Sequence, residues 1–325
     1  MTKRVNYIAI DLGSANTRIY LSDQGLALDE PSVVAVQKKD KYGQILAVGR
    51  EAIGLVSGAS SALKTVWPMK HSVKANFPLI LEMLELFVDQ SVFSCDIQRC
   101  VLMAMPLFLT KAQKKITLET VVTQTGALLG YFIDPNMAAA LGAGLPVTTP
   151  TANLIVDLGA RTTKVSVISR NKVVYAKSCP EGGFKIDEAI SLLVREKYHL
   201  LINDRQAEDI KRRIGAASPS LQVDYLEVQG QDLFSGQPET VNLDSEEVFT
   251  IIDERLKSII ALVHSAIERV PPQLTADLAA RGLVLIGGGA LLRRLDFLLS
   301  VETSLPVRFA DEPLTAVVKG CFLSK

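Results

Sequence analysis

Two short segments of the chain place an acidic residue, a glycine and hydroxyl-bearing side chains in the same order. They read Asp11-Leu-Gly-Ser-Ala-Asn-Thr17 and Asp157-Leu-Gly-Ala-Arg-Thr-Thr163. Successive backbone N–H groups in such a turn form a concavity that binds phosphate, and glycine allows the phosphate to approach closely. The carboxylates of Asp11 and Asp157 can lie beside Mg²⁺ held by those phosphates. One such turn alone is more often a structural hairpin, but the matched pair predicts a nucleotide site.

A third glycine-rich turn, Gly287-Gly-Gly289, follows the apolar run of residues 283–286. A strand that enters a turn without side chains leaves its backbone open, so that a planar base or a phosphate can lie against it. The alternative is a tight strand-to-helix turn that serves only packing. Beside the matched pair, this turn strengthens the prediction of nucleotide binding.

Length and charge limit the classes of protein that the chain can belong to. It has 325 residues, with 35 basic and 35 acidic side chains. A single hydrophobic core usually stops growing at about 250–300 residues, so two domains are expected. The zero net charge argues against nucleic acid as a partner, because phosphate binding normally leaves a basic excess. With 48% hydrophobic and 22% charged residues, the composition is typical of a globular protein rather than a disordered one.

The cysteines and the N-terminus point to the cytoplasm. Cys95, Cys100, Cys179 and Cys321 have neither CxxC spacing nor a histidine pattern beside them, so buried free thiols are expected rather than a zinc site or a disulfide framework. The N-terminus lacks the features of a signal peptide. No apolar run reaches the ~20 residues of a membrane span. We therefore expect a soluble, cytoplasmic protein.

The two matched segments start 146 residues apart (157 minus 11), which indicates an internal duplication with one copy in each domain. Strand-like and helix-like segments alternate along the chain, so the fold class is α/β. Thr110 and Gln113 have the spacing of a capping box at a helix start. The expected helices are residues 75–90, 110–126, 137–141, 185–198, 205–214, 245–270 and 290–299, and the expected strands include 7–10, 17–21, 100–105 and 283–286, with a strand-rich stretch at 221–241.

Residues along nearly the whole chain resemble the MreB family of bacterial actin-like proteins, within the actin and Hsp70 ATPase superfamily. The stretches that carry the resemblance are residues 10–17, 30–35, 137–146, 155–159, 187–190, 205–215, 287–293 and 311–320. The resemblance implies an actin-like fold, with two duplicated α/β domains around a nucleotide cleft, each with a smaller subdomain. The implied subdomains are IA (1–34, 77–146 and 313–325), IB (35–76), IIA (147–184 and 246–312) and IIB (185–245).

The resemblance also implies ATP or ADP with Mg²⁺ as the ligands of the cleft. Asp11 and Asp157 become the carboxylates on the metal side, and Glu208 and Lys211 line the nucleoside from one helix face. The implied nucleotide-binding residues are Gly13, Ser14, Ala15, Asn16, Thr17, Gly159, Ala160, Arg161, Thr162, Thr163, Glu208, Asp209, Ile210, Lys211, Gly287, Gly288, Gly289, Ala290 and Leu291.

Several positions depart from the family pattern. Pro135 stands where the family has the glutamate that orients the attacking water, and proline cannot do so. Asp134 and Thr162 remain as candidate catalytic residues. Asp134 is one residue early, and ~1 Å of misplacement can cost ~100-fold in rate, so slow hydrolysis is expected. Arg161 replaces a family glycine, where a positive φ would cost about 1–2 kcal/mol. Lys164 stands where the family usually has glutamate, adding positive charge near the phosphates.

By the same resemblance the protein is a filament-forming scaffold that organises cell shape and wall synthesis at the inner face of the membrane. Its implied partners are further copies of itself, other MreB paralogues, rod-shape membrane proteins, the wall-synthesis machinery and anionic lipid. Val92 and Phe93 are the candidate membrane contacts, the alternative for Phe93 being the core. Two other functions stay open: a non-polymerising or copolymerising nucleotide-gated regulator of another MreB, and a small-molecule kinase of the same superfamily.

Overall fold

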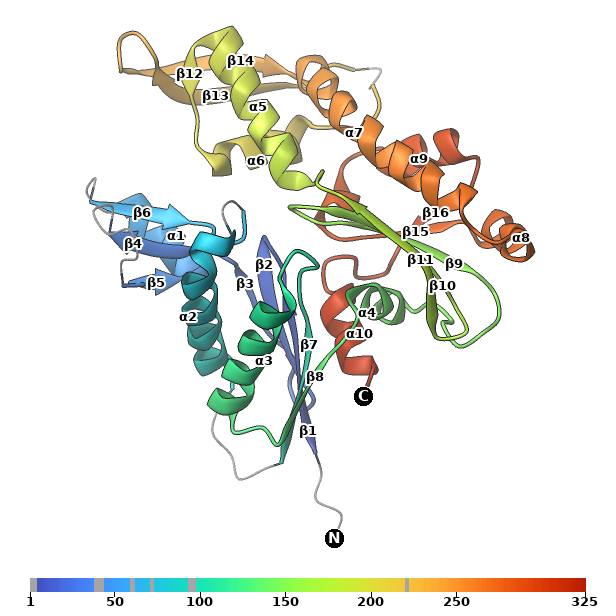
Figure 1. Cartoon of the computed structure of the whole chain (residues 1–325). Coiled ribbons are helices and arrows are strands. Elements are labelled where there is room, and N and C mark those ends of the chain that lie inside the picture. Colours follow the sequence, from blue (N-terminus) through green and yellow to red (C-terminus); the bar gives the residue numbers. More distant parts are fainter. Residues whose placement is uncertain (1–4, 38–43, 59–61, 71–72, 93–97, 220–221) are drawn as a thin grey trace. The chain divides into compact units, whose positions relative to one another are not determined.

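The computed structural model describes residues 5–37, 44–58, 62–70, 73–92, 98–219 and 222–325 (Figure 1). The chain divides into two compact units. Unit 1 is Met1–Leu145 with Thr315–Lys325, and unit 2 is Pro146–Leu314. Each unit contains one five-stranded sheet and one three-stranded sheet.

Unit 1 is built on a sheet with the strand order β3-β2-β1-β7-β8. Its small sheet has the order β5-β4-β6 and is covered by α1. The elements are β1 (Asn6–Leu12), β2 (Asn16–Leu21), β3 (Gly25–Pro31), β4 (Val34–Gln37), β5 (Ala47–Val48), α1 (Gly49–Gly58), β6 (Leu63–Val66), α2 (Val73–Ser91), β7 (Arg99–Ala104), α3 (Lys111–Thr125), β8 (Leu129–Phe132), α4 (Pro135–Gly142) and α10 (Ala316–Leu323).

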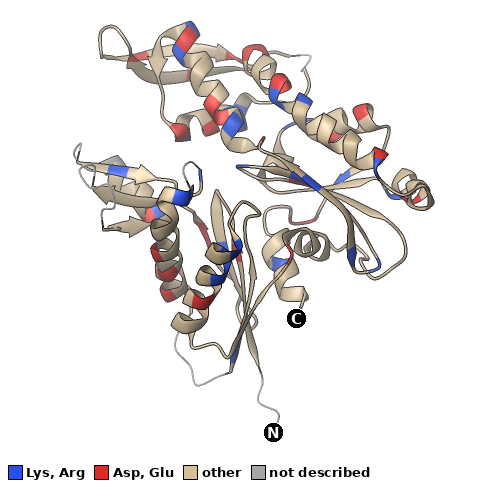
Figure 2. Ribbon diagram, in the orientation of Figure 1, with Lys and Arg blue, Asp and Glu red and all other residues tan. Residues whose placement is uncertain are grey.

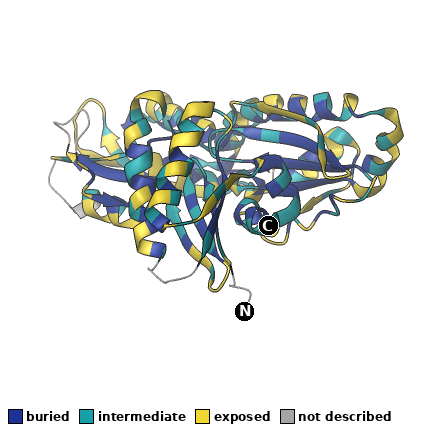
Figure 3. Cartoon of the chain, turned by 60° about the horizontal axis from the view of Figure 1, so that its bottom comes forward, coloured by how far each residue is buried: buried dark blue, intermediate teal, exposed yellow. Residues whose placement is uncertain are grey.

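Alternate residues of the central strands fill two cores, one on each face of the unit 1 sheet. On β1, Ile8 and Ile10 pack with buried residues of α2, while Ala9 between them packs with α4 and α10. Successive side chains of a strand point to opposite faces, so a strand covered on both sides is apolar throughout. Figure 3 shows these central strands as buried and parts of the helices as exposed.

Unit 2 is built on a sheet with the order β11-β10-β9-β15-β16 and carries the small sheet β12-β13-β14. Its elements are β9 (Asn153–Leu158), β10 (Thr163–Ser169), β11 (Lys172–Cys179), α5 (Gly183–Tyr198), β12 (Leu200–Leu201), α6 (Asp204–Ile214), β13 (Tyr225–Asp232), β14 (Pro238–Asp244), α7 (Ser245–Glu268), α8 (Pro272–Arg281), β15 (Leu283–Ile286), the 3₁₀ helix η1 (Gly288–Leu291), α9 (Leu295–Thr303) and β16 (Val307–Phe309).

The two large sheets repeat one topology, as the matched segments predict. In each, three antiparallel strands are followed by two parallel ones. The registers also correspond, since Leu12 pairs with Thr17 and Leu158 pairs with Thr163. Both matched segments are therefore tight turns between an apolar strand and its antiparallel neighbour.

The predicted capping box is confirmed. The Thr110 side chain accepts from the Gln113 backbone N–H, and Gln113 reaches back to the Thr110 backbone N–H. These contacts satisfy two of the N–H groups that a helix start leaves without partners. Gly126, in the left-handed conformation, ends α3 at the expected residue.

The predicted helix 290–299 is wrong at its start. The chain forms a short 3₁₀ turn at Gly288–Leu291 and begins α9 only at Leu295. Arg294 between them has a φ of 63°, which a right-handed helix does not allow. The Arg293 carbonyl accepts from the Ala217 N–H at 2.8 Å, so a long-range backbone contact replaces the local helical one.

Charged residues of both signs are spread through the two units, and neither unit carries one sign alone (Figure 2). Among the described residues, no helix has both the length and the apolar character needed to cross a membrane.

Candidate nucleotide site

The turn between β1 and β2 is braced by Ser32, which sequence reasoning did not single out. The Ser32 hydroxyl donates to the Gly13 carbonyl at 2.7 Å and lies 2.9 Å from the Thr17 hydroxyl. The Ser32 N–H donates to the Ala15 carbonyl at 2.7 Å. A Cβ at position 13 would lie 2.5 Å from the Asn16 carbonyl oxygen, so the turn requires glycine there. The buried hydroxyls of Ser32 and Thr17 therefore stabilise one conformation of this turn.

The predicted residues of this first turn therefore divide into two groups. Thr17 is fully buried, and its hydroxyl contacts Ser32, so it positions the turn from inside. Gly13, Ser14, Ala15 and Asn16 are half-buried and form the accessible part of the turn. The backbone N–H groups of this accessible part are the ones that can receive a phosphate.

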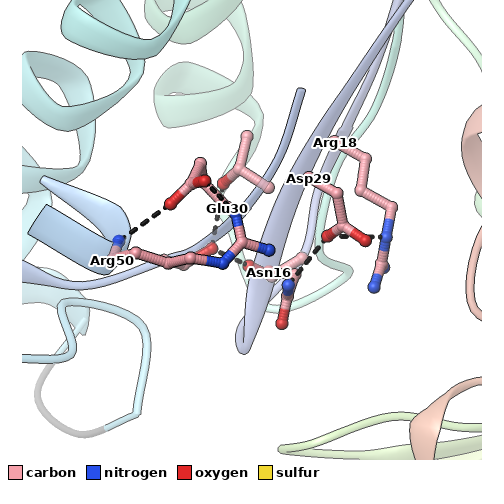
Figure 4. Close-up of polar contacts among 8 residues, drawn as sticks. Asn16, Arg18, Asp29, Glu30 and Arg50 are labelled. Atoms are coloured by element: carbon pink, nitrogen blue, oxygen red, sulfur yellow. Dashed lines mark hydrogen bonds and ion pairs between the residues drawn. The ribbon is translucent and has the colours of Figure 1, made fainter. Parts of the chain in front are cut away.

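Polar contacts extend from the first turn to the next strand (Figure 4). Asp29 on β3 accepts from the Asn16 side-chain amide at 2.8 Å and pairs with the Arg18 guanidinium at 3.1 Å. Its neighbour Glu30 accepts from the Arg50 backbone N–H at 2.8 Å and also pairs with the Arg50 side chain. These contacts connect the first turn, through β3, to α1, the helix that covers the small sheet of unit 1.

Asp11, the predicted carboxylate of unit 1, lies half-buried on β1 just before the turn. The buried thiol of Cys321 on α10 lies close to it. Burial raises the pKa of Cys321 strongly, and the nearby Asp11 carboxylate raises it further. Cys321 therefore stays a neutral thiol near Asp11.

The turn between β9 and β10 repeats this construction in unit 2. The Gly159 N–H donates to the Thr162 carbonyl at 3.1 Å. Thr163, which corresponds in position to Thr17 of the first turn, is fully buried, and its hydroxyl donates to the Glu181 carbonyl at 2.8 Å. Ala160, Arg161 and Thr162 are half-buried. Arg161 is not among the described residues with positive φ, so it carries no left-handed strain.

The start of α5 packs directly on this second turn, a contact that the sequence analysis missed. The N–H groups of Gly183 and Phe184 donate to the carbonyls of Gly159 and Ala160, at 3.1 and 2.7 Å. A Cβ at Gly182 would lie 2.6 Å from the Gly159 oxygen, so a side chain there is excluded. The glycine pair ahead of an apolar-periodic segment was the available signal. At Gly183 the nearest backbone atom to an added Cβ would be 3.7 Å away, so of the two glycines only Gly182 is required by the close backbone contact.

The residues predicted on α6 have different surroundings. Lys211 pairs with Asp187 of α5 at 2.8 Å and donates to the Gly183 carbonyl at 3.3 Å. Glu208 is exposed, and exposed Asp209 pairs with Arg213. Ile210 is 2% exposed and belongs to the core. Lys211 therefore lies next to the second turn, Glu208 is accessible on the same helix, and Ile210 packs α6 against the unit.

The three glycines at 287–289 have different roles. Gly287 has a φ of 84°, and a Cβ there would lie 2.5 Å from the Leu158 oxygen. A Cβ at Gly289 would lie 2.9 Å from the Leu158 Cβ. At Gly288 the nearest atom is 3.8 Å away, on Leu314, so this glycine alone has room beside it. Of the next two predicted residues, Ala290 is buried and Leu291 is exposed.

The predicted metal-side carboxylate of unit 2 already has a cationic partner. Lys164 Nζ lies 2.5 Å from Asp157 Oδ2. The described residues contain no group of three or more His, Cys, Asp or Glu side chains that could hold a metal ion. Mg²⁺ in nucleotide sites needs only one or two carboxylates beside waters and phosphates. Asp11 fits that requirement, whereas Asp157 does not fit a direct metal ligand while Lys164 is bound to it.

Asp134, a candidate catalytic residue, is the N-cap of α4. Its Oδ1 accepts from the backbone N–H groups of Asn136 and Met137, at 2.8 and 3.1 Å. Pro135 is the first residue of the helix, a position that tolerates its missing N–H. The Asp134 carboxylate thus has a structural task at the helix start.

The candidate membrane contact is described only in part. Val92 follows α2, is half-buried and packs against the unit 1 core. Phe93 lies outside the described residues. Val92 therefore contributes to packing within unit 1.

Comparisons with known proteins agree on one family. Residues 5–325 match the family model described as MreB/Mbl protein. The cell shape-determining protein MreB of Escherichia coli K12 is 42% identical over 321 residues, covering 97% of this chain and 92% of the relative. The cell shape-determining protein Mbl of Bacillus subtilis is 35% identical over 314 residues, covering 96% of this chain and 93% of the relative.

Solved structures share the fold. MreB5 of Spiroplasma citri bound to ADP superposes with a TM-score of 0.86 at 28% identity, covering 98% of this chain and 96% of that one. The MamK double helical filament gives a TM-score of 0.81 at 18% identity, covering 99% and 98%. At this identity MamK supports the fold alone, which is the actin-like fold expected from the sequence.

Proposed function

The chain belongs to the MreB/Mbl family, and from that premise we propose that it is an ATP-binding, filament-forming actin-like protein that organises cell shape. The curated relatives, at 35–42% identity, are named for determining cell shape. The observation that carries the proposal is the matched pair of braced turns, each with an accessible backbone segment and a buried threonine behind it.

The nucleotide is ATP or ADP, bound through residues 13–16 and 159–162. MreB5 of Spiroplasma citri has been solved with ADP and with AMPPNP, and it shares this fold at 28% identity. The open face of Gly288 is the place for a planar base in unit 2, with Glu208 and Lys211 of α6 lining the nucleoside. Mg²⁺ would accompany the phosphates, and Asp11 is the carboxylate that would help to hold it.

Hydrolysis of the bound ATP is slow. Pro135 has no group that can orient a water molecule, and Asp134 Oδ1 already accepts two backbone N–H groups at the start of α4. A positioned acid or base normally contributes about 10²–10⁴-fold to such a step. Thr162, on the second turn, is the remaining candidate near the phosphates.

Filaments of this protein act at the inner face of the membrane, with anionic lipid, rod-shape membrane proteins, wall-synthesis proteins and other MreB paralogues as partners. Lys111, Lys114 and Lys115 on α3 are exposed or half-buried cations that can face anionic lipid, although Lys115 also pairs with Glu119. Phe93→Ser tests the membrane contact better than a change at Val92, because Val92 packs against the core. Retained pelleting with phosphatidylglycerol vesicles after Phe93→Ser would count against this contact.

The second candidate function is a nucleotide-gated regulator that caps or copolymerises with another MreB. Pro135 favours it over a kinase, because a kinase of this superfamily would need a carboxylate base beside the substrate and proline has none. Light scattering of the pure protein separates the two main candidates. Growth of scattering on adding AMPPNP supports a filament former, and growth only with a second MreB present supports the regulator.

The test of nucleotide binding compares wild-type protein with Gly13→Val, whose side chain would collide with the Asn16 carbonyl. Gly54→Val is the matched control, because nothing lies within 4 Å of a Cβ at Gly54. We expect wild type and the control to bind fluorescent ADP and to form polymer with AMPPNP, and Gly13→Val to do neither. Equal binding by Gly13→Val would contradict the assignment of the first turn.

A further inference from the structure

We propose that the Lys164 ammonium takes the place of a metal cation at Asp157, so that nucleotide binding in this chain depends only weakly on Mg²⁺. This inference rests on the proposed nucleotide binding and concerns the same site. Lys164 Nζ lies 2.5 Å from Asp157 Oδ2, and the two side chains are 18% and 12% exposed. A pair so largely shielded from water is screened much less than one at the surface.

The pairing follows from the register of the hairpin. Asp157 on β9 lies directly opposite Lys164 on β10, so both side chains project from the same face of the sheet. The duplicated position in unit 1 is similar, since Asp11 lies opposite Arg18. There, however, the guanidinium pairs with Asp29 of the next strand at 3.1 Å. The lysine of unit 2 instead binds the carboxylate at the strand end.

The second oxygen of Asp157 is confined as well. A Cβ at Gly287 would lie 2.8 Å from Asp157 Oδ1, so the glycine backbone is packed against this oxygen. Gly287 has a φ of 84°, and its N–H donates to the Pro313 carbonyl at 2.8 Å. The carboxylate therefore has Lys164 on one oxygen and a fixed backbone beside the other. A metal ion bound at Oδ2 would have to displace the ammonium.

The charge at this position has a direct consequence for a phosphate ligand. Asp157 and Lys164 are each one residue outside the turn-closing pair Leu158 and Thr163, beside the half-buried residues 159–162. A carboxylate alone would repel phosphate oxygens unless a divalent cation lay between them. The lysine cancels that negative charge without a metal. Removal of Mg²⁺ should then weaken nucleotide binding much less than if position 164 carried no cation.

The experiment measures the affinity of fluorescent ADP for the full chain in excess Mg²⁺ and in EDTA. For wild type we expect affinity to fall by less than about threefold in EDTA, whereas for Lys164→Glu it should fall by at least about tenfold. Lys164→Gln, which keeps a polar side chain without charge, should lie between them. Lys172→Glu is the matched control, because Lys172 is an exposed lysine on β11 of the same sheet. It should behave as wild type.

Folding of each variant is checked by its thermal melting, and Lys164→Gln carries the comparison if Lys164→Glu does not fold. Wild type that loses ADP in EDTA as completely as the Lys164 variants would overturn this inference and leave the proposed function intact. An equal loss in Lys172→Glu would overturn it too, since general charge would then explain the effect. Failure of wild type to bind ADP even with Mg²⁺ would overturn the proposed function and this inference together.

Discussion

Lys211 on α6 and Asp187 on α5 form an ion pair of 2.8 Å whose side chains are 17% and 7% exposed. Lys211 also donates to the Gly183 carbonyl, and Gly183 in turn donates to Gly159 in the second turn. The pair therefore links the small-sheet region of unit 2 to the turn proposed to bind phosphate. Lys211, which is predicted to contact the nucleoside, therefore also stabilises the structure around the second turn.

Removal of one member of this pair leaves the other charge buried without its partner. We expect Asp187→Ala and Lys211→Met each to lower the free energy of unfolding by about 3 kcal/mol. The double variant should cost less than the sum, because both charges are then gone. Thermal unfolding measures the three changes. Additive losses would mean that the two side chains do not stabilise each other.

Close backbone contact between α4 and α10 predicts a strong response to added methyl groups. A Cβ at Gly142 would lie 1.7 Å from the Ala316 oxygen, and one at Gly320 would lie 1.7 Å from the Ala138 oxygen. We expect Gly320→Ala to destabilise the protein by about 1–3 kcal/mol or more, by forcing the helices apart. In the control Gly54→Ala, on α1, the methyl meets nothing and should stabilise by up to about 1 kcal/mol. Equal melting temperatures for the two variants would refute the contact.

Ser32 should matter for nucleotide binding although it is buried behind the turn. Ser32→Ala removes the contacts of its hydroxyl with Gly13 and Thr17, so the first turn loses its brace. We expect a stability loss of about 1–3 kcal/mol and a fall in ADP affinity of about tenfold. Ser22→Ala removes a hydrogen bond to the Tyr7 N–H at the other end of the same strands. The control should lose stability only, and a matching loss of affinity would argue against a specific role for Ser32.

Pro135→Glu tests the proposal that hydrolysis is slow because position 135 carries no carboxylate. The change keeps the Asp134 cap and introduces, at the first position of α4, the glutamate that the family resemblance implies for orienting water. We expect phosphate release to rise by about tenfold or more, within the range of a positioned acid or base. Pro135→Gln, of the same size but without a carboxylate, should stay near wild type. An equal rise in the glutamine variant would assign the effect to loss of the proline ring.

Local signals predicted much of the fold. The strand at 283–286, the capping box of Thr110 and the repeated turns were readable because each depends on a short stretch of residues. The break before α9 was not, since it depends on the backbone contact between Ala217 and Arg293. The Asp157–Lys164 pair could not be predicted without knowing the register of the hairpin. The contacts of Ser32 could not be predicted either, because they form only when the chain after β3 returns to the first turn. Spacing proposed which residues belong to the candidate site, but only the tertiary contacts show which of them are buried supports and which are accessible.

The most direct test of the account follows polymer and phosphate together in one sample of pure protein with Mg-ATP. Pelleting at successive times gives the polymer, and the supernatant gives the phosphate released. If hydrolysis is slow, polymer should reach its plateau while the released phosphate is still far below the number of polymerised protomers. Phosphate release that keeps pace with polymer growth would contradict slow hydrolysis, and the absence of polymer with any adenine nucleotide would contradict the proposed filament.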